Sequence, residues 1–303
     1  MSNVRLAIAG MVTLDLVYVT EAHPLEDSEN PVLEHALVVG GPAGRSAIAA
    51  GRLGGNVELL AMIGTGTFAA LLQDQLAPEP LKIQWVQEEG PSQHSCVLVS
   101  QETGLRTTIW LPQPRVNKEF VRRVDGLLRQ TDTVLFDCTD QAATKSIVAS
   151  SRANGATGVV DTGSYKPWVE EVLPGVEHIV VPEKFLSRRL PSAASSRDAA
   201  IQTFADLGPR VLGVTRGKLG GLWVDEDGLH DYAPYPVQAI DTCGAGDTFH
   251  GAYAWAVAAG LPIANAFDVA AWSAGCKCGT LGNAGIPGFS DLALQHPELL
   301  EPR

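Results

Sequence analysis

The chain has 303 residues, 45% of them hydrophobic and 18% charged, which is enough for one large or two moderate globular domains. Its formal net charge of −12 argues against a nucleic acid or an anionic membrane as partner, because both require a basic surface. The longest apolar run, around residues 252–261, is too short to span a bilayer. Five scattered cysteines show no zinc-site spacing, and we expect a reduced, cytoplasmic protein without a signal peptide.

Hydrophobic periodicity predicts the elements in chain order. Strands are expected at 4–10, 32–39 and 57–63, helices at 47–53 and 68–76, and a β-hairpin from 95–100 and 106–111 around the turn 102–104. The second half alternates strands with helices: strands at 133–137, 158–161, 179–181 and 211–215, helices at 141–154, 184–190 and 197–207. A hairpin at 222–231 and two long helices follow, the second at 263–278. Repeated βα units predict a doubly wound, mostly parallel sheet with ligands at the strands' carboxyl ends, where Asp137 and Asp161 lie.

The stretch 241–251, DTCGAGDTFHG, follows an extended segment at 237–240 and opens an apolar-faced helix that stops at Gly260. Gly244, Ala245 and Gly246 therefore lie at a helix N-terminus, where free N–H groups and the helix dipole attract an anion. Asp247 comes next, and a carboxylate beside a bound phosphate is repelled unless it takes a proton from the attacking group. The spacing indicates phosphorylation of a hydroxyl with Asp247 as the base; ordinary helix capping by Asp247 is the alternative.

The pattern D-T-x-G-A-G-D-x-F before an Ala-rich helix resembles the C-terminal signature of the ribokinase-like (PfkB) family of sugar and nucleoside kinases. The run P-x-E-D-S-E at 24–29 is similar to ketohexokinase-like members, and Gly-Pro-Ala at 41–43 to sulfofructose-kinase-like members. The resemblance implies an ATP-dependent carbohydrate kinase that uses Mg²⁺. It also implies one three-layer α/β/α domain over 1–303, with a small β-sheet lid from about 14–39 and 92–112.

The resemblance also implies the residues that bind the sugar. Asp15 is expected to hydrogen-bond sugar hydroxyls, Gly40 and Gly41 to let substrate approach the backbone, and Trp110 to face or cover the sugar. Related lids clasp one another in dimers, so a homodimer is expected in which Asp27 reaches the neighbouring site; a solvated loop acid is the alternative.

Arg45 departs from the family pattern, because relatives have asparagine at this position and at that of Pro42. A guanidinium suits a carboxylate or phosphate, so an Arg45 that faces the pocket predicts an anionic sugar. The alternative is an arginine that turns to solvent or pairs with an acid.

The segment V-T-x-G-x-x-G at 214–220 resembles the family's nucleotide loop, with Thr215 offering its hydroxyl to phosphate and Gly217 and Gly220 admitting the nucleoside. By the same resemblance Arg106 contacts the nucleotide phosphates. The small-residue loop at 279–287 fits against adenine through Asn283 and Ala284.

Metal ligands are also carried over from the family. An acid at the place of Asp161 lies near the phosphates and Mg²⁺, and the loop at Asp241 often holds K⁺. The family's N-x-x-E motif would fall at 182–185 and is absent, which leaves Glu183 to act through water.

Two other functions remain open. The same scaffold could serve a nucleoside kinase. A different class is suggested by G-x-G-x-x-A at 64–69 after a strand, with Glu88 or Glu89 after the next strand as the ribose-binding acid of an NAD-dependent oxidoreductase.

Overall fold

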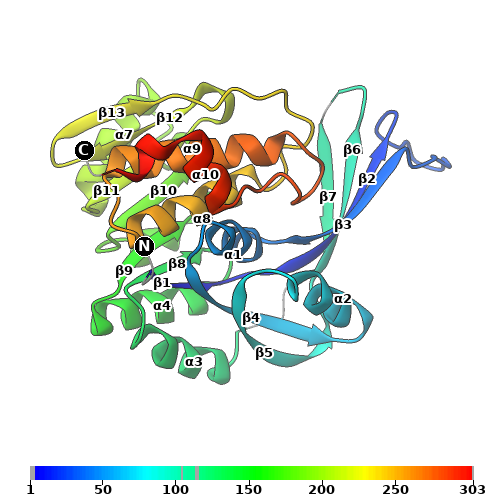
Figure 1. The fold of residues 1–303 in the computed structure, drawn as a ribbon, viewed down its shortest axis with the longest axis horizontal. Helices are drawn as coiled ribbons and strands as arrows, with labels where there is room; N and C mark the ends of the chain where they lie inside the picture. Colours follow the sequence, from blue (N-terminus) through cyan, green and yellow to red (C-terminus); the bar gives the residue numbers. More distant parts are fainter. Residues whose placement is uncertain (1–3, 104, 113–115, 302–303) are drawn as a thin grey trace.

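A computed structural model describes residues 4–103, 105–112 and 116–301, and they form two β-sheets flanked by helices (Figure 1). The large sheet has nine strands in the order β13-β12-β11-β10-β9-β8-β1-β4-β5. All neighbours from β11 to β5 are parallel, and β12 and β13 extend one edge as an antiparallel hairpin. The bounds are Arg5–Ala9 (β1), Asn56–Thr65 (β4), Leu81–Pro91 (β5), Thr133–Asp137 (β8), Thr157–Asp161 (β9), His178–Pro182 (β10), Val211–Thr215 (β11), Gly221–Asp225 (β12) and Gly228–Tyr232 (β13).

Helices cover both faces of the large sheet, because its central strands are apolar on both sides. Leu6 and Ile8 of β1 join one core cluster, and Ala7 and Ala9 join the other. The first face carries α1 (Pro42–Arg52), α2 (Thr67–Leu76), α8 (Ala245–Ala258), α9 (Ile263–Cys278) and α10 (Phe289–Gln295). The second carries α3 (Lys118–Leu128), α4 (Gln141–Asn154), α5 (Val169–Val172), α6 (Glu183–Arg189) and α7 (Ser196–Leu207). Among the described helices, none has the length and apolarity needed to cross a membrane.

A second sheet of four strands, which we call the small sheet, has the order β3-β2-β6-β7. It stands beside the large sheet in Figure 1, and the loop between β2 and β3 projects beyond it. β2 and β6 are parallel, whereas β3 and β7 pair antiparallel on the two outer sides. Its bounds are Thr13–Thr20 (β2), Glu34–Gly40 (β3), His94–Ser100 (β6) and Arg106–Trp110 (β7). The expected three-layer fold and small sheet are therefore confirmed; Gly104 of the expected hairpin turn lies outside the described residues.

Several local expectations need correction. The first helix begins at Pro42 rather than residue 47, because proline is favourable in a first turn and Gly41, at φ +78°, ends the preceding strand. Residues 237–240 belong to neither sheet, after Pro234 and Pro236, which lack an N–H donor. Strand β5 extends to Pro91, so Glu88 and Glu89, which are expected after this strand, lie within it.

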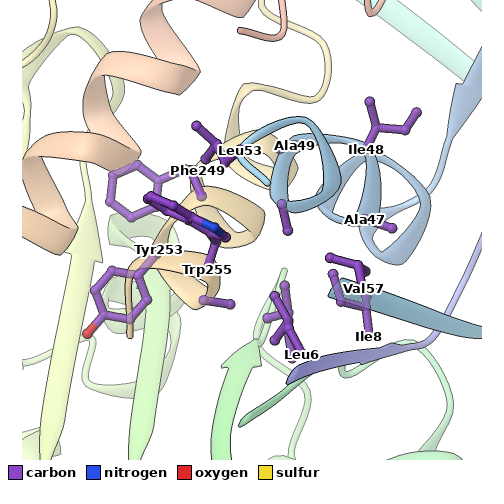
Figure 2. Close-up of a cluster of buried hydrophobic side chains, with 14 of the residues drawn as sticks. Leu6, Ile8, Ala47, Ile48, Ala49, Leu53, Val57, Phe249, Tyr253 and Trp255 are labelled. Atoms are coloured by element: carbon purple, nitrogen blue, oxygen red, sulfur yellow. The ribbon is translucent and has the colours of Figure 1, made fainter. Parts of the chain in front are cut away.

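Helices α1 and α8 cross at very short range, and this crossing positions the residues discussed below. A Cβ added to Gly251 would lie 2.2 Å from the Ser46 carbonyl oxygen, so only glycine fits there. The Ser46 hydroxyl also donates to the Asp247 carbonyl oxygen at 2.8 Å. Around the crossing, Ala47, Ile48 and Ala49 of α1 and its C-cap residue Leu53 pack in one cluster with Phe249, Tyr253 and Trp255 of α8 (Figure 2).

We predict that Gly251→Ala lowers the free energy of unfolding by about 1–3 kcal/mol, because the added methyl group must push the two backbones apart. Chemical denaturation measures this change. Gly126→Ala in α3 is the matched control: its Cβ meets nothing within 4 Å, so the substitution is expected to be neutral or stabilising. Equal effects at the two positions would contradict a tight crossing.

Candidate active site

Asp247 lies in the first turn of α8, on the residue after the glycine turn. The N-cap of the helix is Gly244 in a left-handed conformation (φ +81°), and no side chain caps the helix. The capping alternative for Asp247 is therefore not realised. Its carboxylate is one-fifth exposed, and a Cβ on neighbouring Gly246 would meet nothing within 4 Å. An open position with a carboxylate thus adjoins the N-terminus of the helix, where the Ala245 N–H donates to the Thr242 carbonyl oxygen at 3.4 Å.

Arg45 of α1 is buried between two acids. Its guanidinium donates to Asp15 Oδ2 at 2.6 Å and to Asp247 Oδ2 at 3.3 Å. A Cβ on Gly244 would come within 2.3 Å of Arg45 Cδ, so the side chain packs directly against the glycine turn. The sequence left open whether Arg45 faces the substrate pocket or turns to solvent or pairs with an acid, and in the structure it pairs with two acids.

Asp15 in β2 is only 5% exposed and accepts two further hydrogen bonds. The hydroxyl groups of Thr13 and Ser95 each donate to its Oδ1 at 2.7 Å. Gly40 lies directly against this carboxylate, because an added Cβ would overlap it. Asp15 is thus a well-satisfied acid that holds Arg45 with little surface left open.

Two more carboxylates end adjacent strands of the large sheet, since Asp137 of β8 pairs in register with Asp161 of β9. Burial raises the pKa of Asp137 to about 6, although it accepts hydrogen bonds from the backbone N–H groups of Met11 and Thr139. Burial likewise raises the pKa of Asp247; Arg45 opposes this shift and the Asp161 charge adds to it. A raised pKa suits a group that must accept a proton.

A cavity of about 490 Å³ opens beside the glycine turn. It is lined by four of the residues expected to bind nucleotide, Arg106, Thr215, Gly217 and Gly220, and by Ala245 and Gly246 of the glycine turn. Arg106 of β7 reaches across from the small sheet and donates to the Thr242 hydroxyl at 3.3 Å. The structure therefore brings the small sheet, the segment 214–220 expected to bind nucleotide, and the glycine turn around one space.

Other expected site residues lie elsewhere. Asn283 and Ala284 do not line this cavity; the Asn283 amide donates to the Val39 carbonyl oxygen at 2.8 Å instead. Trp110 is 62% exposed on the edge strand β7, and Asp27 is exposed in the loop between β2 and β3.

The expected metal residues are spread out. Asp161 accepts from the Gly163 N–H at 2.9 Å and lies 3.4 Å from His250 Nδ1, while Glu183 opens α6. In the described part of the chain no three His, Cys, Asp or Glu side chains form a metal-binding group. Asp161 is a single carboxylate, and proteins usually hold Mg²⁺ through one or two carboxylates together with substrate phosphates and water. Asp241 is paired with buried Lys277.

The sequence reading missed several residues of the site. Tyr232, Pro234, Tyr235 and Pro236 line the cavity, and the dense Y-A-P-Y-P run was the available signal. His250, which contacts the Gly246 carbonyl oxygen at 2.7 Å through Nδ1, was a polar residue on a buried helix face.

The dinucleotide pattern at 64–69 has a packing explanation. A Cβ on Gly64 would overlap the backbone of 90–92, so this glycine makes room for protein rather than for a cofactor. Glu88 lies within β5 and accepts from the Asn117 amide at 2.6 Å.

Comparison with known proteins assigns the class. Residues 4–287 match the pattern of the pfkB family of carbohydrate kinases. Mouse ketohexokinase is 24% identical over 315 residues, covering 94% of this chain and 100% of the relative. Arabidopsis thaliana ribokinase, solved with ribose and ATP, superposes with a TM-score of 0.83 at 18% identity and covers 99% of each chain. Escherichia coli phosphofructokinase-2, solved in complex with potassium, gives 0.82 at 17% identity over 99% of this chain and 100% of its own.

The fold and the match together define an ATP-dependent phosphotransferase. The chain belongs to the PfkB family of carbohydrate kinases and has its ribokinase-like fold. Kinases of this family use ATP and Mg²⁺.

Proposed function

We propose that this enzyme transfers the γ-phosphate of ATP to a hydroxyl group of a neutral ketose or closely related sugar. One observation carries the proposal: the Asp247 carboxylate is partly exposed beside the uncapped N-terminus of α8, next to the nucleotide-sized cavity. In this proposal Asp247 takes the hydroxyl proton, and the amides of Gly244, Ala245 and Gly246 stabilise the charge on the moving phosphoryl group.

The cavity supports a nucleotide with its phosphates towards the glycine turn. In this proposal Thr215 and Arg106 contact the phosphates, and the lining residues Tyr235, Val237 and Ala271 contact the base. Asp161 would help to hold Mg²⁺ on the phosphates, with Glu183 acting through water. The metal would neutralise phosphate charge, which a protein with a net charge of −12 cannot do by its overall field.

The charges around Arg45 favour a neutral acceptor. Two carboxylates, Asp15 and Asp247, share one guanidinium, so the group has one negative charge in excess before substrate arrives. A substrate carboxylate or phosphate placed here would meet like charge, whereas sugar hydroxyls could donate to the remaining carboxylate lone pairs. This argues against the anionic sugar considered from the sequence.

The small sheet is also the proposed dimer contact. Its strand β7 exposes Ile109 and Trp110 at an unpaired edge, and the β2–β3 loop exposes Leu33. Exposed apolar side chains along an edge strand are typical of protein–protein contacts. All five cysteines are free, which suits the reducing cytoplasm that we propose as its location.

A substrate panel tests the proposal through ADP release from ATP and Mg²⁺. Neutral ketoses should be phosphorylated much faster than aldoses, sugar acids, sugar phosphates or nucleosides. Preferential phosphorylation of adenosine would instead indicate a nucleoside kinase, and a preference for sugar acids would contradict the argument from Arg45.

We predict that Asp247→Asn lowers kcat by about 10²–10⁴ and leaves ATP affinity nearly unchanged, because the amide keeps the shape but cannot accept the proton. Steady-state kinetics and calorimetric ATP titration measure the two effects. Asp74→Asn, at an exposed position on α2, is the control and should behave as the wild type. A near-normal kcat for Asp247→Asn would remove this residue from the role of base.

We predict a pH profile that depends on Arg45. Activity requires the ionised Asp247, so it is lost as the pH falls through the raised pKa of this group, above the usual value of 3.8. Arg45 lowers that pKa, so in Arg45→Gln the acid limb of kcat should move to higher pH. Arg45→Lys keeps a charge and should retain a limb closer to that of the wild type. If the pH at which kcat falls is the same in Arg45→Gln as in the wild type, the ionisation of Asp247 does not determine the acid limb.

We predict that Arg106→Ala raises the Kd for ATP roughly 10- to 100-fold, as expected for losing a hydrogen bond to a charged phosphate. Arg129→Ala provides the control, because Arg129 follows α3 on the opposite face of the large sheet and pairs with Asp125. An unchanged ATP affinity in Arg106→Ala would place the nucleotide phosphates elsewhere.

A further inference from the structure

Lys277 is a fully buried lysine in the last turn of α9, with 0% of its surface exposed. Its ammonium group donates to the Asp241 carbonyl oxygen at 2.8 Å and to Asp241 Oδ2 at 2.7 Å. Both partners belong to the residue that opens the glycine signature. A charge with no access to water requires such close partners, and here both come from one residue.

Asp241 in turn forms hydrogen bonds with the glycine turn that follows it and with the end of α9 and the loop after it. Its Oδ1 accepts from the Cys243 N–H at 2.8 Å, and its Oδ2 accepts from the Gly282 N–H at 3.0 Å. Its own N–H donates to the Cys278 carbonyl oxygen at 3.2 Å. The carboxylate therefore fixes the turn that leads into Gly244 and also the start of the loop after α9.

This arrangement adjoins the nucleotide cavity. Thr242 and Cys278, which follow Asp241 and Lys277 in the sequence, line it, and the next residues of the turn are those of the proposed anion hole. The carboxyl end of α9, where Lys277 lies, carries the negative end of the helix dipole, which also favours a cation. The positive charge of Lys277 is thus bound to the residue whose carboxylate accepts from the Cys243 and Gly282 N–H groups.

We propose that the Lys277 ammonium group acts as a built-in monovalent cation that holds the glycine turn, so that the enzyme needs no bound K⁺. The inference deepens the proposed function and rests on it. A K⁺ at Asp241 would need the same carbonyl and carboxylate oxygens that Lys277 already uses, so the K⁺ expected there from the sequence does not fit. Lys277 is a positioning residue, since it acts through Asp241 rather than on the substrate.

The first test is cation dependence of the wild-type enzyme, assayed in KCl and in tetramethylammonium chloride at equal ionic strength. We expect kcat, KM and the Kd for ADP to be the same in both salts. An increase in kcat or in ADP affinity of about fivefold or more in KCl would overturn the proposal. A change of this size is typical of the coupling between two binding sites. The ADP titration needs no acceptor sugar, so it still decides the matter if no sugar on the panel is phosphorylated.

The second test is cation rescue in Lys277→Ala, which leaves a small space beside Asp241. In tetramethylammonium chloride this variant should lose ADP affinity and melt at a lower temperature, and K⁺, ammonium or methylammonium should restore both. Lys145→Ala is the control, because Lys145 is half-exposed and pairs with Glu171 on the protein surface. It should behave as the wild type in every salt.

Two outcomes of the rescue would overturn the proposal. One is that Lys277→Ala has the ADP affinity and the melting temperature of the wild type in tetramethylammonium chloride, without any small cation. The other is a folded but weakly binding variant that no small cation improves, which would mean that Lys277 only fills space. If Lys277→Ala does not fold, Lys277→Met replaces it, because methionine keeps most of the side-chain volume without the charge. A folded Lys277→Met with normal ADP affinity would count against the proposal. The comparison of the wild-type enzyme in the two salts needs neither variant.

Discussion

One buried guanidinium joins the three parts of the molecule that meet at the site. Arg45 comes from α1, Asp15 from the small sheet and Asp247 from the first turn of α8. Without the guanidinium, two carboxylates would lie close together in a poorly hydrated place and repel each other. The close contact of Ser46 with Gly251 holds α1 and α8 at the distance that this bridge requires.

A second buried cation, Lys277, lies at the start of the same glycine turn. The turn from Asp241 to Asp247 is thus held between Lys277 at one end and Arg45 at the other. Both cations are bound by the chain's own acids, so they shape the backbone and add little free positive charge. This is consistent with the proposal that a protein with a net charge of −12 binds an anion at a turn made mainly of peptide N–H groups.

The sequence was sufficient for the fold and for the position of the glycine turn, and less so for side-chain partners. Periodicity predicted β8, α4 and α9 at their observed bounds, because β8 is buried along its whole length and the buried positions of both helices recur at helical spacing. It did not predict that Arg45 meets Asp247, 202 residues away, since that contact depends on how α1 and α8 cross. The pairing of Lys277 with Asp241 was missed for the same reason, although a lone lysine in an apolar helix was a visible signal. The helix expected at 47–53 begins five residues earlier, at Pro42, because proline is favourable in the first turn of a helix.

The small sheet is joined to the rest of the chain at one end of its four strands. β2 begins at Thr13 just after β1, β3 ends at Gly40 against α1, β6 begins at His94 just after β5, and β7 ends at Trp110. A rotation of this sheet would therefore take place at the short junctions 10–12, 41 and 92–93, and its hydrogen-bonded strands would move together. Asp15 and Arg106 both lie in the small sheet. A single rotation of the sheet would therefore move Asp15, which binds Arg45, together with Arg106, which binds Thr242.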